Sequence, residues 1–327
     1  VFYLFFANGG NGIGVLTGDS PAGPWRDPLG KPLITRDIKN CEDVVWLFDP
    51  AVLIDDDGTG WLYFGGGIPG EEFANPDTAR VVRLSEDLLS LDGEVQKIDA
   101  PYLFEDSGIN KINGRYYYSY CSNFSTEGNS LGLHSGAIQY MVSDSPAGPF
   151  EYVGEVFENP GAFFLLSGNN HHSIFQFNNE FYLAYHARTV EKAMGISGNY
   201  RSTHIDKLDF SDGKFHKAVG TYEGVKQIKK FNPYKTVQAS TMSDNGGIEV
   251  NIHNTGAYAK AKEGSWIKVS DVDFKEAAKS VTIRVRAQEK AYIKISAGSR
   301  ESEKAVYIEI PDTAGEFADI TEAVSDF

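Results

Sequence analysis

Cysteine, methionine and long apolar runs are all scarce in this sequence of 327 residues, which has two cysteines and three methionines. Two cysteines, Cys41 and Cys121, are too few for a disulfide framework, and their separation is not that of metal ligands. We therefore expect two buried free thiols. No apolar run reaches membrane-spanning length, which predicts no membrane partner. No segment has the pattern of a signal peptide, so the N-terminus does not indicate a compartment.

Positive charge is also in short supply. The chain has 30 Lys and Arg against 45 Asp and Glu, a net charge of -15. Such an acidic chain predicts no nucleic-acid partner and no binding to an anionic membrane. It is compatible with a neutral ligand such as a carbohydrate, although solubility alone would explain the charge equally well.

Several familiar catalytic motifs are missing. The sequence has no Gly-rich phosphate loop, no GxSxG elbow and no Cys/His pair in a nucleophile's setting. The acidic run 55–58, Asp-Asp-Asp-Gly, resembles a calcium loop in composition only, because it lacks the spacing and the closing Glu. We interpret it as a hairpin turn.

Glycine and aromatic residues are abundant, with 34 Gly, 17 Tyr and 21 Phe, which favours strands and tight turns. Aromatic strands recur with spacings of 60, 54 and 65 residues, and the segment SPAGP occurs twice. The strands begin at Val1, Trp61, Arg115 and Glu180. The last three have a predicted partner strand before them, over 51–54, 108–112 and 173–177. Further strands are expected over 13–17, 79–84, 136–142 and 218–222. Each repeat therefore predicts a four-stranded antiparallel sheet, which is a propeller blade.

The strand at Val1 has no partner before it. We count three full blades and one partial blade, whereas a closed ring usually needs at least four. We therefore expect at least one strand, and a whole blade by preference, upstream of Val1.

The pattern changes after Val225. Residues 226–327 begin with a lysine-rich linker and continue as short alternating strands separated by turn residues, which predicts a β-sandwich. The expected strands are 247–253, 265–269, 280–287, 291–296 and 304–309. No convincing closing strand follows, so we expect this domain to be incomplete. The predicted fold class is all-β, with a propeller over 1–225 and a sandwich over 226–327.

Three hairpins open on a polar group that can do chemistry. Asp49 precedes one, and a carboxylate there would be buried near the axis with a perturbed pKa. A structural Asp bonded to backbone amides is an equally good interpretation. Glu105 holds the matching place one repeat later, and its apolar neighbours suit a general acid; a solvated loop glutamate is the alternative. Simple alternation places Asp106 on the opposite face.

Histidines open the third hairpin. Of His171 and His172, one should face the axis, either as a core histidine or as a ligand to a metal or water, and no zinc-type cluster accompanies them. His186 is another core candidate. Trp46 could stack on a sugar ring or pack between blades.

These segments resemble glycoside hydrolase family 43, in particular its arabinoxylan arabinofuranohydrolase branch. The resemblance is carried by FDPAVLIDDDGTGWLYFGGG, APYLFEDSGINKINGRYYYSYCSNF and GNNHHSIFQFNNEFYLAYHAR. It implies a five-bladed propeller, here with its first blade missing or incomplete. It also implies an inverting hydrolase that removes α-L-arabinofuranosyl side chains from arabinoxylan, outside the cell.

The resemblance also implies roles for particular residues. Glu105 matches the general acid and Asp49 the carboxylate that orients it and tunes its pKa. The general base has no match in this sequence. His171 matches an axial histidine that holds calcium or water; no cofactor is required, but structural Ca²⁺ is allowed. Residues matching substrate contacts are Trp46, Asn170 and Arg201.

The segment from about Asn232 resembles a family 6 carbohydrate-binding module. Gln238 and Ser240 replace its usual acidic pair, and Phe317 stands where a sugar-stacking Trp is common. Glycan binding by this domain is therefore open, and it could instead brace the propeller.

Two further functions remain open. A β-xylosidase or arabinanase could use the same fold, and pocket depth would separate them. A non-catalytic glycan-binding propeller would explain the absent base.

Overall fold

The computed structural model describes residues 1–253 and 256–324, which form two compact units, Val1–Val225 and Lys226–Phe327. Strands are the main regular structure of the described chain, as predicted for an all-β fold, and they are accompanied by two short helices. None of its helices has the length and apolar character needed to cross a membrane.

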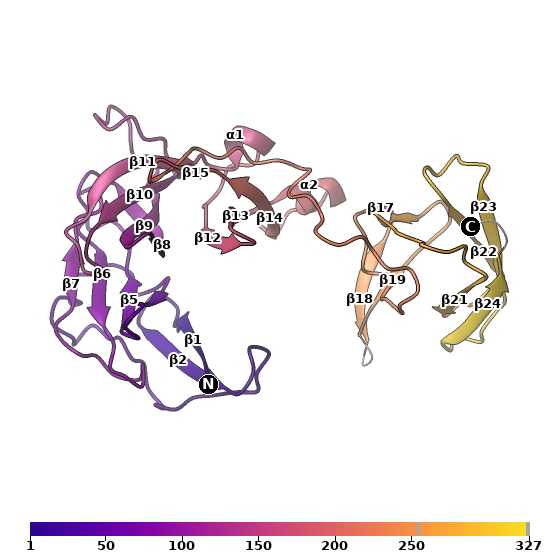
Figure 1. Ribbon diagram of the computed structural model, residues 1–327, viewed down its shortest axis with the longest axis horizontal. Coiled ribbons are helices and arrows are strands. Elements are labelled where there is room, and N and C mark those ends of the chain that lie inside the picture. Colours follow the sequence, from indigo (N-terminus) through magenta and orange to yellow (C-terminus); the bar gives the residue numbers. More distant parts are fainter. Residues whose placement is uncertain (254–255, 325–327) are drawn as a thin grey trace. The chain divides into compact units, whose positions relative to one another are not determined.

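The first unit is a series of small antiparallel sheets that follow one another in chain order (Figure 1). One sheet has the order β1-β2-β3, and the next has the order β4-β5-β6-β7. The bounds are β1 Phe2–Ala7, β2 Ile13–Gly18, β3 Trp25–Arg26, β4 Ala51–Ile54, β5 Gly60–Phe64, β6 Ala79–Arg83 and β7 Gln96–Ile98.

The following sheets repeat this plan. One has the order β11-β10-β9-β8, another β12-β13-β14, and β15 pairs with β16. The bounds are β8 Leu103–Ile112, β9 Arg115–Ser122, β10 Ile138–Ser143, β11 Glu151–Phe157, β12 His172–Phe177, β13 Glu180–Ala187, β14 Ser202–Leu208, β15 Phe210–Ser211 and β16 Lys214–Phe215, with helices α1 Gly161–Phe164 and α2 Thr189–Met194. None of these sheets closes on itself within the described residues.

The three predicted hairpins are present, because each contains residues that form a tight turn between its two strands. The acidic turn joins β4 to β5, with the Gly58 N–H donating to the Asp55 carbonyl at 2.9 Å. Asn113-Gly114 joins β8 to β9, and Asn178-Asn179 joins β12 to β13. Asn113, Asn178 and Asn179 all have positive φ, which Asn accommodates readily.

The prediction of a strand over 218–222 is wrong, because these residues form no strand. Only Ala218 makes a bridge, to Phe157, and the Thr221 N–H is instead taken by the carboxylate of Asp206 at 3.0 Å. A side chain that captures a backbone donor removes it from any ladder.

Apolar side chains between the sheets form the core, and both cysteines lie in it as buried free thiols, as predicted. Burial raises the pKa of Cys41 to about 11, so this thiol is unreactive at neutral pH. Tyr63 of β5 and Tyr118 of β9 stack at 6.0 Å between neighbouring sheets. The aromatic strands therefore hold adjacent sheets together.

Strand β8 contacts both of the other inner strands, β4 and β12, and its polar side chains link it to each of them. Lys111 of β8 forms an ion pair with Asp55 and reaches Asp56 at 2.8 Å in the β4–β5 turn. The Asn110 amide donates to the Ile174 carbonyl of β12 at 2.9 Å. Strands β4 and β8 are thus fixed to each other at the ends opposite to Asp49 and Glu105.

The second unit consists of two-stranded pairs: β17 with β20, β18 with β19, β21 with β24, and β22 with β23. The bounds are β17 Asp244–Gly246, β18 Glu249–His253, β19 Gly256–Lys260, β20 Trp266–Lys268, β21 Ser280–Val285, β22 Ala291–Ser296, β23 Ala305–Ile310 and β24 Ala318–Ala323. The last strand, β24, is one that the sequence analysis missed. Its sequence, ADITEA, is short and acidic, yet it pairs with β21 over six residues.

Arg80 of β6 is the largest fully buried side chain of the described chain. Its guanidinium donates to the carbonyls of Asn40, Asp77 and Ala79, and it pairs with Asp43 at 2.9 Å. Burying a charge is tolerable only when it is hydrogen-bonded in this way. Arg80 therefore fixes the loop that leads to Trp46 and Asp49.

Replacing Arg80 by Leu should lower the free energy of unfolding by about 3 kcal/mol, because several buried carbonyls lose their donors. The matched control is Arg83→Leu on the same strand, whose side chain is exposed and pairs with Asp92 at the surface. That change should cost less than about 1 kcal/mol. Chemical denaturation measures both, and equal effects would contradict this account of Arg80.

Candidate active site

The polar groups that open the three hairpins converge on one imidazole, that of His171. Its Nε2 lies 3.2 Å from Glu105 Oε1 and 3.7 Å from Asp49 Oδ2. On the other side of the ring, Nδ1 lies 3.5 Å from Asp106 Oδ1. The sequence analysis grouped Glu105, Asp49 and His171, and the structure brings them together; it also adds a third carboxylate.

The prediction that Asp106 faces away from Glu105 is wrong. Strand β8 carries a bulge here, because its pairing with β9 shifts register between Glu105 and Gly108. Asp106 sits in the bulge with φ of 72°, a left-handed conformation that Asp tolerates better than most residues. The bulge breaks the alternation of faces, so both carboxylates reach the same imidazole.

Asp106 holds the ends of three inner strands together. Its N–H donates to Asp49 Oδ2 at 3.0 Å, and its carboxylate accepts the N–H of His172 at 2.9 Å and contacts the His172 ring. The other ring nitrogen of His172 is 2.7 Å from the Ser119 hydroxyl. A Cβ at Gly108 would lie 2.5 Å from that hydroxyl and 3.1 Å from the His172 ring. Glycine is therefore required for this close approach.

The carboxylates determine the charge of His171. Burial alone would lower its pKa, but the contact with Glu105 and the charges of Asp106, Glu105 and Asp49 outweigh burial and raise the pKa to about 9. The ring is therefore an imidazolium at neutral pH, and it offsets part of the negative charge around it.

The carboxylate of Asp49 lies in an environment that disfavours its negative charge. Burial raises its pKa to about 6, against the opposing influence of His171 and of the Asp106 N–H. Its φ of 49° is again left-handed, which stores strain at the site. A carboxyl that titrates near pH 6 beside a second carboxyl can modulate its neighbour's proton affinity.

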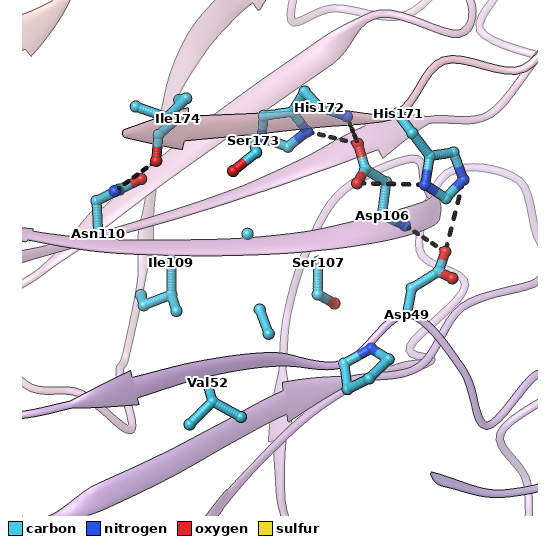
Figure 2. Close-up of a pocket in the computed structure, with 13 residues that line it drawn as sticks. Asp49, Val52, Asp106, Ser107, Ile109, Asn110, His171, His172, Ser173 and Ile174 are labelled. Carbon is cyan, nitrogen blue, oxygen red and sulfur yellow. Dashed lines mark hydrogen bonds and ion pairs between the residues drawn. The ribbon is translucent and has the colours of Figure 1, made fainter. Parts of the chain in front are cut away.

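A cavity of about 370 Å³ lies alongside this group, between the first halves of β4, β8 and β12. Figure 2 shows Asp49, Asp106, His171 and His172 together at one end of it. Glu105 does not line the cavity, and only 7% of its surface is exposed.

Trp46 starts a row of aromatic rings that includes Phe104, the residue before Glu105 in the chain. Its ring lies 5.2 Å from both Phe48 and Phe104, and Phe104 meets Phe124 edge-on at 5.5 Å. Phe124 is half exposed and lines a second hollow of about 590 Å³, formed by residues 124–127 and 133–135. The row thus leads from Trp46 to the surface at Phe124.

The other predicted substrate contacts lie near His171 in different settings. Asn170 is fully buried; its amide donates to the carbonyls of Gly136 and Glu158, while its Oδ1 has no partner. Arg201 is exposed, and its guanidinium donates to Asn169 Oδ1 at 3.2 Å. Their contact with a sugar stays a prediction.

His186, the remaining histidine candidate, stacks on His171 at 6.0 Å. Burial and the charges of Arg201 and His171 lower its pKa to about 4, so it is neutral. It therefore packs against the imidazolium without adding charge to the site.

The family resemblance allows either a structural Ca²⁺ or a water at His171. Asp49, Glu105 and His171 can each turn one ligand atom toward a common point, within 4.8 Å of one another. Calcium takes six to eight oxygen ligands, whereas this group offers two carboxylates and a nitrogen that carries a proton at neutral pH. These three residues therefore do not supply enough oxygen ligands to bind calcium on their own.

The all-β architecture and the buried carboxylate group are compatible with a glycosidase, and comparison with known proteins shows the family. The model of glycosyl hydrolases family 43 matches residues 1–215. The chain therefore belongs to family 43 of the glycosyl hydrolases.

Within that family the chain is similar to arabinoxylan arabinofuranohydrolases. It is 46% identical to one from Paenibacillus polymyxa, covering 96% of this chain and 52% of that protein. It is 45% identical to one from Bacillus subtilis, covering 96% and 64%. A crystal structure of a B. subtilis arabinoxylan arabinofuranohydrolase with cellotetraose matches with a TM-score of 0.88 at 45% identity, covering 99% of this chain and 70% of that one. The chain spans about half to two thirds of the length of these two curated relatives.

The pKa of His171 provides a test of the site. Its proton should stabilise the fold fully below pH 6.5, the ordinary value, and this contribution should be lost as the pH rises through about 9. Titration of the imidazole signals by NMR should show a midpoint near 9 in the wild type and a lower one in Glu105→Gln. Glu127→Gln, an exposed change elsewhere, should leave the midpoint unchanged. A wild-type midpoint near 6.5 would refute the arrangement.

Proposed function

We propose that the protein containing this chain is an inverting glycosidase that removes α-L-arabinofuranosyl side chains from arabinoxylan. The observation that carries the proposal is the group of Glu105, Asp49 and Asp106 around His171, within a chain 45–46% identical to two arabinoxylan arabinofuranohydrolases. The identity to relatives named as β-xylosidase or xylosidase/arabinosidase is lower, 29–31%.

In this mechanism Glu105 is the general acid and protonates the glycosidic oxygen as the bond to the arabinose breaks. The carboxyl of Glu105 is largely buried, with 7% of the residue exposed, and lies 3.2 Å from the His171 ring, which fixes its position for proton transfer. Asp49 holds the backbone of Asp106 and shares the imidazolium with Glu105, so it orients the acid and tunes its proton affinity. The imidazolium stabilises Glu105 as a carboxylate after the proton has left.

The general base is proposed to lie outside these 327 residues. Asp106 is not suited to that role, because its oxygens are engaged by the His172 N–H and by both histidine rings. Inversion requires a base about 6.5–9.5 Å from the acid, with room for a water between them. Strand β1, whose exposed face carries Phe2, Leu4 and Phe6, has an edge and a face on which a further strand and sheet could pack.

The polymer is proposed to lie along the aromatic row Trp46–Phe104–Phe124. Flat apolar rings next to polar groups are a common means of holding pyranose rings. The sheets of 1–225 are then blades of a five-bladed propeller, and 226–327 is a β-sandwich. An extracellular location would fit a polymeric substrate.

The second unit is proposed to be a carbohydrate-binding module or a brace for the propeller. The setting of Phe317 weighs against sugar stacking at that position, since Arg286 lies over its ring at 5.3 Å and Tyr258 meets it edge-on at 5.9 Å. A ring engaged in this way offers less of its face to a sugar.

In the whole protein, which supplies the base, replacing Glu105 by Gln should slow arabinose release from arabinoxylan by about 10²–10⁴-fold, because the leaving oxygen loses its proton donor. Cleavage of 4-nitrophenyl α-L-arabinofuranoside should fall much less, since nitrophenolate leaves without protonation. Glu86→Gln, which removes an exposed carboxylate outside the proposed polymer-binding surface, is the control. Near-wild-type release from the polymer by a folded Glu105→Gln protein would exclude Glu105 as the acid.

If the general base lies outside this chain, an anionic nucleophile added to the solution should take the place of the water that the base would activate. Azide should accelerate cleavage of 4-nitrophenyl α-L-arabinofuranoside by this chain, forming the carbon–nitrogen bond as nitrophenolate leaves and giving the inverted β-arabinofuranosyl azide. The xylopyranoside analogue should react far more slowly. Product anomers are read by NMR. Rapid hydrolysis without azide, and no azide product, would place the base within the chain; preference for the xyloside would favour a β-xylosidase.

A further inference from the structure

The segment from Val190 to Tyr200 reverses the usual distribution of polar and apolar side chains. Its one buried residue is charged, Glu191, with 7% of its surface exposed. The apolar side chains are the exposed ones: Val190, Met194, Ile196 and Tyr200, at 44% to 64%. A soluble surface normally shows the opposite pattern, and exposed apolar groups gathered on one segment indicate a surface that receives a ligand.

Glu191 holds this segment in one conformation. Its Oε2 accepts the N–H of Gly198 at 3.1 Å and that of Tyr200 at 2.6 Å. The residue between them, Asn199, is left-handed, so the two N–H groups form an anion-binding nest around a carboxylate from the chain itself. Arg188 lies 3.8 Å from the other oxygen and partly balances the charge.

Tyr200 is supported from beneath by backbone. A Cβ at Gly198 would lie 2.5 Å, 2.9 Å and 3.1 Å from three atoms of the Tyr200 ring. One side of the ring therefore packs against Gly198, while 64% of the residue remains exposed. A ring fixed on one side and open on the other requires little further ordering when a ligand stacks on it.

The segment is tied directly to the candidate active site. Arg188 donates to the Ser167 carbonyl at 2.6 Å and to Asn199 Oδ1 at 3.0 Å. Arg201, next to Tyr200, donates to Asn169, two residues before His171. Residues 188–201, which we call the clasp loop, are thus hydrogen-bonded at both ends to the segment that precedes β12 and carries His171.

We propose that the clasp loop is a sugar-binding subsite in which Tyr200 stacks on a neutral pyranose ring of the polysaccharide main chain. Glu191 is the positioning residue that holds the platform. The subsite rests on the proposed function, since it binds the part of the substrate that remains after arabinose is removed. It determines affinity for the polymer and leaves the arabinofuranosyl pocket itself unchanged.

Titration calorimetry of the full chain with an arabinose-substituted xylo-oligosaccharide, and separately with free arabinose, tests this subsite. Tyr200→Ala and Gly198→Ala should each weaken oligosaccharide binding about five- to tenfold and leave arabinose binding unchanged. Gly198→Ala displaces the ring while keeping it. Gly168→Ala is the matched control, because a Cβ there meets nothing within 4 Å. Glu191→Ala should weaken oligosaccharide binding as much as Gly198→Ala, and Glu191→Gln less, because its amide oxygen still accepts the two N–H groups.

The outcomes separate the two proposals. A wild-type chain that binds the oligosaccharide, with Tyr200→Ala and Gly198→Ala binding equally well, would overturn the subsite and leave the proposed function intact. A wild-type chain that binds neither sugar would overturn the proposed function and the subsite with it. An equal loss of both affinities would assign the loop a purely structural role.

Discussion

The site depends on one buried imidazolium that three carboxylates share. His171 can hold its proton only because Glu105, Asp49 and Asp106 surround it, and these carboxylates can lie so close together only because the proton is there. The members come from the starts of three neighbouring inner strands. The protonation of His171 and the packing of the sheets therefore depend on each other, so a change in one would also change the other.

Turn chemistry and periodicity made much of the fold predictable. Asn-Gly and Asp-Gly turns between aromatic runs located the hairpins, and the repeated place of Asp49, Glu105 and His171 located the site. Asp106 was missed because alternation assumes an unbroken strand, and the bulge in β8 depends on its register against β9. The run 218–222 has the composition of a strand, but Asp206 takes its backbone donor. Such long-range competition is not visible in a local pattern.

Two buried acidic residues show how position decides the role of a carboxylate. Glu105 lies 3.2 Å from the His171 imidazole, in the position proposed for the general acid. Glu191 is equally buried but accepts two backbone N–H groups, which gives it a conformational role. Burial alone marks both as unusual, and only their partners separate the two functions.

The links from Lys111 to Asp55 and Asp56 fix the ends of β4 and β8 that lie away from the carboxylates. Strands anchored there allow the loops at the other end to vary at a low cost in stability. Changes within 124–135, or between Arg188 and Arg201, would reshape the surface proposed to face the polymer and leave the carboxylate–imidazolium group in place. Over evolutionary time, relatives of this chain could therefore diverge in the polysaccharides they recognise while retaining one chemical centre.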